Sequence, residues 1–302
     1  MSDCGNKNIK YFLGIDGGGS KTEFLLTDTA KKEIRRIVLG SSNPVNMGID
    51  NAFSVLKKGI EEVCDGINLG EVSAFAGIAG SMNSENKNQI NNFLSQFGFG
   101  FYNNGSDVEN ALETALGTSD GVAVIMGTGI VAFSRVDTEL HRVGGWGYLI
   151  DKGGSGFALG SAALNSAFSF FDGRGGSELI FTLAEKKLGK PLNDSIAYIY
   201  SRGLTFVASF ASVLFEAYKK GDSEAAKILE QNLEETARII SSAAKHLNGD
   251  KKIVLCGGLC NQAEIIEPII KKHLNEEYNL IFSTEPMVNG AISLAERGAE
   301  YA

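Results

Sequence analysis

Features that would assign this chain to a specialised class of protein are scarce. Only four of its 302 residues are prolines, which excludes a proline-rich or collagen-like protein. The four cysteines, Cys4, Cys64, Cys256 and Cys260, are too few for a disulfide framework. Three residues separate the last two, a spacing that matches neither the common zinc motifs nor the thioredoxin motif. We therefore expect buried thiols in a reducing compartment.

Long apolar runs and an excess of basic residues are also missing. No stretch approaches the 18 apolar residues typical of a membrane-spanning helix, and the polar first ten residues are unlike a signal peptide. The chain has 28 Lys and Arg against 36 Asp and Glu, a net charge of −8, whereas nucleic-acid binding needs clustered cations. The three histidines share no metal-ligand spacing. The sequence predicts a soluble, cytoplasmic protein without a membrane or nucleic-acid partner.

Glycine, by contrast, is abundant, with 37 residues of 302. The length suggests about two domains, and short apolar runs alternate with segments of helical spacing, which predicts an α/β architecture. The expected strands are Tyr11–Ile15, Glu23–Thr27, Ile34–Leu39, Val72–Ile78, Val122–Met126, Ile130–Arg135, Lys252–Cys256 and Leu280–Ser283. The expected helices are Ile49–Gly66, Glu85–Phe97, Ser155–Phe171, Ser177–Leu188, Ile196–Tyr218, Ser223–Leu247, Gln262–Leu274 and Val288–Arg297.

Two segments of the chain are similar to each other. FLGIDGGGSKTEFLLTD near the start and VAVIMGTGIVAFSRVD in the middle both consist of a strand, a glycine turn, a second strand and an aspartate. Such internal similarity predicts two related α/β domains, with a helix-rich insertion in the second half.

The first glycine turn has the composition of a phosphate-binding loop. Consecutive glycines expose backbone N–H groups that form an anion nest, and the neighbouring side chains add donors. The aspartate at the strand end is suited to hold Mg²⁺ directly or through water. The alternative is a tight hairpin with solvated side chains. The candidate phosphate-binding residues here are Asp16, Gly17, Gly18, Gly19, Ser20, Lys21 and Thr22.

Two further glycine turns are candidates for the same nucleotide. Gly127, Thr128 and Gly129 form a hairpin tip with a hydroxyl, which suits a second phosphate clamp better than a dinucleotide fingerprint, because a strand follows it. Gly257 and Gly258 close a strand and precede a helix, where the helix N-terminus favours a nucleotide. An ordinary strand-to-helix loop is the alternative for this last pair.

Two acidic or aromatic positions are candidates for substrate chemistry. Asp107 lies where a strand ends and a helix begins, so it is either a helix cap or a general base for a hydroxyl. On the following helix Glu109 and Glu113 are interpreted as solvated charges. Trp146, the only tryptophan, lies between glycines and suits either core packing or contact with a sugar ring.

Taken together, these motifs resemble those of the N-acetylglucosamine kinases and the BadF/BadG/BcrA/BcrD ATPase family, within the actin/hexokinase/Hsp70 superfamily. The segments that carry the resemblance are GIDGGGSKTEFLLTD, MGTGI, VLCGGL, PMVNGAI and GGWGYLID with GSGFALG. The resemblance implies a two-domain actin-like ATPase (ribonuclease H-like) fold with duplicated βββαβα cores and a nucleotide cleft between them. It implies a first domain of residues 1–115 and 288–302, a second of 116–287, and a homodimer.

The resemblance also assigns roles to individual residues. It makes Asp107 the catalytic base, Asn43 a ligand of sugar hydroxyls, and Ser20 and Thr128 contacts of the ATP phosphates. Gly145, Trp146 and Gly147 become the sugar-binding segment. Here the chain departs from the family pattern G-D-E-G-S, because Lys152 stands in place of the aspartate and Asp151 lies one position earlier. Asp151 then substitutes for the missing acid, or Lys152 meets an acidic substituent of the sugar.

The function implied is transfer of the γ-phosphate of ATP, with Mg²⁺, to the 6-hydroxyl of N-acetylglucosamine or N-acetylmuramic acid. Glucosamine is an alternative substrate. A different class is an ATPase that activates a dehydratase, which requires cysteines that ligate an iron–sulfur cluster. The cysteine spacing here does not favour that class.

The second phosphate motif also departs from the family pattern. It ends in Ile130 rather than the usual serine, which removes one hydroxyl from that loop.

Overall fold

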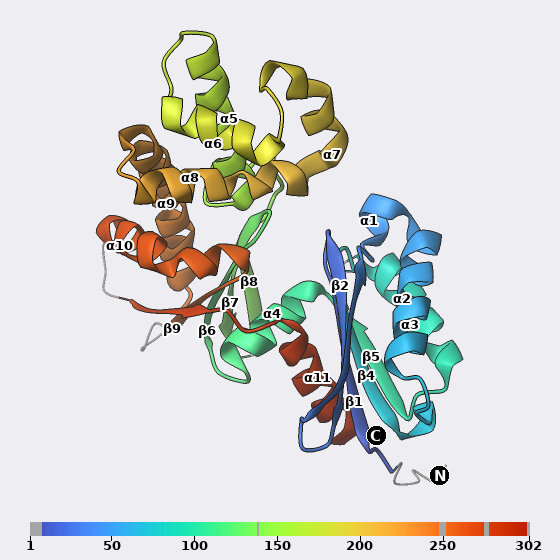
Figure 1. Ribbon diagram of the computed structural model, residues 1–302. Coiled ribbons are helices and arrows are strands. Elements are labelled where there is room, and N and C mark those ends of the chain that lie inside the picture. Colours follow the sequence, from blue (N-terminus) through green and yellow to red (C-terminus); the bar gives the residue numbers. More distant parts are fainter. Residues whose placement is uncertain (1–7, 82, 138, 248–251, 275–277, 301–302) are drawn as a thin grey trace. The chain divides into compact units, whose positions relative to one another are not determined.

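The computed structural model describes residues 8–81, 83–137, 139–247, 252–274 and 278–300, which form two compact units. The first unit contains the described residues up to Thr118 and those from Glu285 onward, and the second contains Ser119–Thr284. Cys4 lies outside the described residues. Each unit has a five-stranded sheet covered by helices (Figure 1).

The first unit is built on a sheet with the order β3-β2-β1-β4-β5. β1, β2 and β3 are antiparallel neighbours, whereas β1, β4 and β5 run parallel. Its strands are β1 (Tyr11–Gly17), β2 (Lys21–Asp28), β3 (Glu33–Gly40), β4 (Val72–Ile78) and β5 (Phe101–Gly105). Its helices are α1 (Pro44–Met47), α2 (Ile49–Val63), α3 (Ser84–Leu94), α4 (Asp107–Leu116) and α11 (Val288–Glu300), with short 3-10 turns at Leu69–Glu71 and Ser95–Phe97.

Both faces of this sheet are covered, so β4 is buried along its whole length, and all of its residues except Ser73 are apolar. On one face Leu13, Phe24 and Leu26 pack with apolar residues of α2 and α3. On the other face Phe12 and Phe75 pack against α11. The C-terminal helix therefore completes the core of the N-terminal unit.

The second unit repeats this topology with the sheet order β10-β9-β6-β7-β8. Its strands are β6 (Gly121–Met126), β7 (Ile130–Val136), β8 (Glu139–Gly144), β9 (Lys252–Cys256) and β10 (Asn279–Ser283). Its helices are α5 (Gly156–Phe171), α6 (Glu178–Leu188), α7 (Ile196–Ser209), α8 (Ala211–Lys219), α9 (Ser223–Ala244) and α10 (Ala263–His273), with 3-10 turns at Asn193–Ser195 and Gly258–Gln262. In each unit three antiparallel strands come first, and the fourth strand, β4 or β9, then pairs parallel to β1 or β6. The predicted duplication is therefore confirmed.

Two predicted features of the second unit need correction. The single helix expected over Ile196–Tyr218 is broken, because Gly203 adopts a φ of +72° and α7 ends at Ser209 before α8 begins. The strand β8 was not expected, since its residues are mostly polar. It is an edge strand that pairs only with β7 among the described strands. An edge strand is partly open to solvent, so its residues need not be apolar.

Three of the cysteines, Cys64, Cys256 and Cys260, are buried free thiols. Burial raises the pKa of Cys64 and of Cys260 to about 12, which keeps both thiols protonated. No single helix among the described residues is both long and apolar enough to cross a membrane; the bent pair Asn193–Ser209 and Ala211–Lys219 meets that requirement only jointly.

Candidate functional site

The sheet topology of the first unit gathers several predicted site residues at one edge. Because β1, β4 and β5 are parallel, their carboxyl ends lie together, and the register pairs Asp16 with Gly77 and Gly77 with Gly105. Asp107 begins α4 two residues after β5 ends. Two acids 91 residues apart in sequence (107 − 16) are thus brought to the same edge of the sheet.

Asn110, three residues after Asp107 on α4, supports Asp16, and the sequence did not single it out. Its side chain is completely buried, and its Nδ2 lies 2.9 Å from Asp16 Oδ1 and 3.1 Å from Ile15 O. Its Oδ1 is also buried and accepts no hydrogen bond from the residues that the structure describes. Gly77 leaves the space for this amide, since a Cβ there would lie 2.3 Å from it. A polar residue one helical turn after Asp107, beside Ala111 and Leu112, was the available signal.

Both carboxylates have a raised pKa. Burial is the main cause of the rise for Asp16, to about 6, and the neighbouring Asp107 adds to it, while the hydrogen bond from Asn110 opposes it. Burial likewise raises the pKa of Asp107. Perturbed carboxylates of this kind are enriched at functional sites, because structural positions rarely keep a charge in so costly a place.

The start of α4 decides between the two roles considered for Asp107. Ser106 occupies the cap position, and its N–H donates to Glu109 Oε1 at 3.1 Å. Asp107 is the first helical residue, and its Oδ1 accepts from the N–H of Val108, at 3.1 Å. The capping role is therefore filled by another residue, which leaves Asp107 available as a base.

The interpretation of Glu109 and Glu113 as solvated charges is wrong. Glu109 is the third residue of α4, and its carboxylate completes the capping box by accepting from the N–H of Ser106. Glu113 is 9% exposed, and its Oε1 lies 2.7 Å from Nη1 of Arg297. This ion pair links α4, the helix that begins with Asp107, to α11.

The first glycine turn is a tight hairpin between β1 and β2, in which Gly18 N–H donates to Lys21 O at 2.9 Å. Lys21 Nζ lies 3.1 Å from Glu23 Oε2, so its charge is already paired in this structure. Thr22 corrects an expectation: its side chain is 0% exposed, and its hydroxyl lies 2.8 Å from both Gly40 O and Ser42 Oγ. It cannot donate to a phosphate without leaving the core. Gly19 and Ser20, at the tip, are exposed.

The loop before α1 packs against this turn. Ser41 Oγ donates to Gly18 O at 3.0 Å and accepts from Asn43 N–H at 3.2 Å. Asn43 caps α1, with its Oδ1 accepting from Val45 N–H at 2.9 Å. The Asn43 amide NH₂ makes no hydrogen bond within the described residues, so it is the part of this side chain that is available to a ligand.

The corresponding edge of the second unit carries no acid at the strand end. The turn after β6 is closed by Gly127 N–H, which donates to Gly129 O at 2.9 Å. α5 starts against this turn, with Gly156 N–H donating to Gly127 O at 2.8 Å and Phe157 N–H to Thr128 O at 3.0 Å. The arrangement holds the backbone of the tip rigidly and leaves the Thr128 hydroxyl without a partner in the described structure.

Gly257 lies at the same edge, because β9 runs parallel to β6. It has a φ of +103°, and a Cβ there would lie 2.6 Å from Met126 O. Only glycine fits this close contact between the two strand ends. Gly258, next in the chain, is exposed at the start of the 3-10 turn that leads to α10.

The predicted sugar-binding segment is a loop after β8. Trp146 is 62% exposed, which excludes the core-packing alternative, and the Arg142 guanidinium lies 4.4 Å from the centre of its ring. Asp151 stabilises the loop by accepting from Gly147 N–H through Oδ2, at 2.9 Å. Lys152 is exposed, and in the described structure no side chain pairs with it.

Within the described residues, no group of three or more His, Cys, Asp or Glu side chains is placed to hold a metal ion. His141 and His246 do stack, with ring centres 4.2 Å apart, which their sequence positions did not suggest. Asp16 nevertheless fits Mg²⁺, which proteins often bind through one or two carboxylates together with substrate phosphates and water.

Known sugar kinases are similar to this chain over most of its length. The chain is 33% identical over 282 residues to an N-acetylmuramic acid/N-acetylglucosamine kinase of Clostridium acetobutylicum, covering 89% of this chain and 92% of the relative. It is 26% identical to an N-acetyl-D-glucosamine kinase of Dictyostelium discoideum, covering 89% and 91%. A solved structure from Chromobacterium violaceum, provisionally assigned as an N-acetylglucosamine kinase, has the same fold, with a TM-score of 0.77, 22% identity and coverage of 95% and 99%.

The match to a family model extends over nearly the whole chain, from residue 13 to residue 295, and so includes both sheets and all the strand-end positions described above. The fold expected from the sequence, a two-unit α/β ATPase of the actin-like type, is confirmed by this match and by the shared fold. The chain belongs to the BadF/BadG/BcrA/BcrD ATPase family.

Proposed function

We propose that this chain is an ATP-dependent amino-sugar kinase, which transfers the γ-phosphate of ATP to the 6-hydroxyl of N-acetylglucosamine or N-acetylmuramic acid. The observation that carries the proposal is the convergence of Asp16 and Asp107 at one sheet edge, where Asn110 of α4 donates to Asp16. The kinase relative from Clostridium acetobutylicum, which aligns over 89% of this chain, supports the substrate class.

Asp107 is the group that we assign as general base. Its raised pKa makes the ionised form a stronger proton acceptor than an exposed aspartate, which suits the removal of a proton from a sugar hydroxyl. Proton transfer to a positioned base contributes about 10²–10⁴-fold to a rate.

Asp16 is the residue that we assign to Mg²⁺, directly or through water. The ion would neutralise charge on the triphosphate during transfer. The backbone of Gly17, Gly18, Gly19, Gly127 and Gly129 is proposed to line the phosphates. Because the N–H groups of Gly18 and Gly127 already close the hairpins, the proposed donors are the N–H groups of Gly19 and Gly129 and the hydroxyls of Ser20 and Thr128, with Lys21 if it leaves Glu23. Gly257 and Gly258 are assigned to the adenosine.

The choice of sugar is assigned to the second unit's loop together with Asn43. Gly145, Trp146, Gly147 and Asp151 are the proposed ring contacts, and the unpaired Lys152 favours a substrate with a carboxylate, such as N-acetylmuramic acid. We predict that Lys152→Ala lowers kcat/KM for N-acetylmuramic acid about tenfold and changes that for N-acetylglucosamine less than twofold. Equal effects on both sugars would remove Lys152 from the specificity assignment.

The experiment that tests the function is a coupled ADP-release assay with MgATP. The sugars are N-acetylglucosamine, N-acetylmuramic acid, glucosamine, N-acetylmannosamine and glucose, with a sugar-free control, and the wild type is compared with Asp107→Asn. Sugar-dependent ADP release that is lost in the variant supports the kinase, and the ranking of kcat/KM identifies the sugar. ADP release without sugar, unchanged by Asp107→Asn, would point instead to the dehydratase-activating ATPases.

A further inference from the structure

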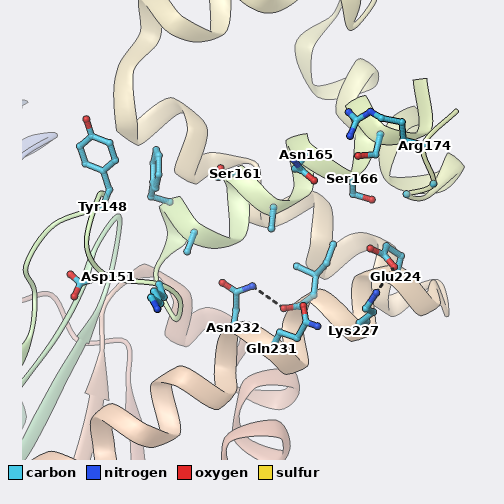
Figure 2. A pocket seen from close by; sticks show the side chains of 18 residues that line it. Tyr148, Asp151, Ser161, Asn165, Ser166, Arg174, Glu224, Lys227, Gln231 and Asn232 are labelled. Carbon is cyan, nitrogen blue, oxygen red and sulfur yellow. Dashed lines mark hydrogen bonds and ion pairs between the residues drawn. The ribbon is translucent and has the colours of Figure 1, made fainter. Parts of the chain in front are cut away.

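A large groove lies within the second unit, beside the loop that carries Trp146. Its volume is about 770 Å³, and it is formed by α5, the N-terminal half of α9 and the turn at Arg174–Gly176. Figure 2 shows Tyr148 and Asp151 at one end and Arg174 and Glu224 at the other. A volume of this size is within the usual range of small-molecule sites and exceeds what a single sugar ring fills.

The long sides of the groove carry neutral hydrogen-bonding groups. Ser161, Asn165 and Ser169 follow one another at intervals of four residues along α5, so they project from one face of that helix. Gln231 of α9 lines the opposite side, as Figure 2 shows. None of these four side chains makes a hydrogen bond or ion pair within the described part of the chain. Their donors and acceptors are therefore available to a ligand.

The end next to the loop is aromatic. The rings of Tyr148 and Phe157 meet edge to face, with centres 5.0 Å apart, and both line the groove. An aromatic surface beside amides and hydroxyls is the combination that recognises a sugar ring, whose C–H faces are apolar and whose edges carry hydroxyls.

Charges in the groove are nearly balanced, which argues against a polyanionic ligand. Arg174 pairs with Asp172 at 2.7 Å, and Lys227 lies 3.9 Å from Glu224. The cation that remains is Lys152, at the loop end. A neutral or singly charged polyhydroxyl ligand matches this distribution better than a phosphorylated one.

We propose that this groove is a subsite for a second sugar ring, glycosidically linked to the amino sugar that the loop binds. The inference rests on the proposed kinase function, since the loop residues Asp151 and Lys152 line the groove and also belong to the assigned sugar site. A linked disaccharide would place one ring at the loop and the other between α5 and α9.

The test is calorimetric binding of N,N′-diacetylchitobiose and of N-acetylglucosamine to the wild type and to Asn165→Ala/Gln231→Ala. Both residues are exposed on helices, so the fold should persist. The matched control is Asn88→Ala/Asn92→Ala, which removes two exposed amides from α3 of the other unit. We expect the wild type to bind the disaccharide about tenfold more tightly than the monosaccharide, and the groove variant alone to lose that advantage.

Several outcomes would overturn the subsite. It fails if the disaccharide binds no more tightly than the monosaccharide, if the groove variant weakens both ligands equally, or if the groove variant changes the oligomeric state in sedimentation, which would make this face a contact between copies. ADP release with N-acetylglucosamine, measured on the same samples, separates the two hypotheses. Phosphorylation of the monosaccharide without a disaccharide advantage removes the subsite alone, whereas no phosphorylation of any sugar removes the proposed function.

Discussion

The two units share one sheet topology but differ at the equivalent ends of β1 and β6. β1 ends in Ile15-Asp16-Gly17, and β6 ends in Ile125-Met126 with Gly127 next in the chain. A glycine turn and an antiparallel strand follow each of them. Met126 is completely buried and packs in the core of its unit. Asp16 occupies the corresponding place with a pKa raised to about 6. An apolar residue satisfies the fold at this position in the second unit. This comparison supports the proposal that the carboxylate of Asp16 serves chemistry rather than stability.

The change with the largest expected effect removes the carboxylate that we propose as the base, Asp107. Asp107→Asn preserves the size of the side chain and its place at the start of α4, and it should lower kcat about 10²–10⁴-fold with little change in the KM for ATP. Steady-state kinetics with the best sugar of the panel measures this. If Asp107→Asn keeps more than a tenth of the wild-type kcat, Asp107 is not the general base.

A second change makes the first unit resemble the second. Asp16→Asn should reduce Mg²⁺-dependent turnover about 100-fold and yet stabilise the ligand-free protein by about 1–3 kcal/mol at pH 7. Because the folded-state pKa is raised above 3.8, ionisation of Asp16 costs stability as the pH rises from about 4 to about 6. The stability advantage of the variant should therefore be full above pH 6 and absent below pH 4.

Thermal or urea unfolding at pH 4, 5, 6 and 7 tests this, with binding of MgADP measured in parallel. A wild type that is more stable than Asp16→Asn at pH 7 would contradict the view that this carboxylate is costly.

The reverse change places an acid in the second unit. Met126→Asp should destabilise the protein by about 2–4 kcal/mol at pH 7 and by less at pH 4, where the new carboxyl is protonated. Urea unfolding at the two pH values measures the difference, and Met126→Leu is the control, expected to cost below about 1.5 kcal/mol. Equal losses for the two variants would mean that the strand end of the second unit tolerates charge.

The smallest effect concerns the amide that supports Asp16. Asn110→Ala removes the hydrogen bond to Asp16 Oδ1, so it should raise the KM for MgATP about tenfold and leave the sugar KM nearly unchanged. Loss of this bond raises the pKa of Asp16 further, and the acidic limb of the pH–rate profile should move to higher pH. The kinetic profiles of the variant and the wild type decide it. An unchanged acidic limb would show that Asn110 serves the fold alone.

Much of the fold could be predicted because local patterns report on it. The hairpins around Gly17 and Gly127 and most of the helices follow from residue periodicity and turn composition. The patterns failed where one residue overrode its neighbours, as Gly203 does in the expected long helix, and where an edge position relaxed the need for apolar residues, as in β8.

The sequence named the candidate acids of the site but did not show how they come together. Asp16 could be named because an acid at the end of an apolar strand is unusual in itself. Asp107 could be named from its place between a strand and a helix and from the family resemblance. The parallel pairing that brings them to one edge depends on segments far apart in sequence. Thr22 was misjudged for the same reason, since the partners of its hydroxyl, Gly40 and Ser42, come from the far end of another strand.

By itself, then, the sequence determined the alternation of strands and helices, the two glycine hairpins, and the presence of two acids at strand ends. Only the tertiary structure decided which polar groups are buried and what they contact: Asn110 against Asp16, Glu113 against Arg297, and the hydroxyls and amides along the groove. The physical reason is that propensity acts within a few residues, whereas burial, a pKa and a hydrogen-bond partner depend on chain segments as far apart as the 184 residues between Glu113 and Arg297.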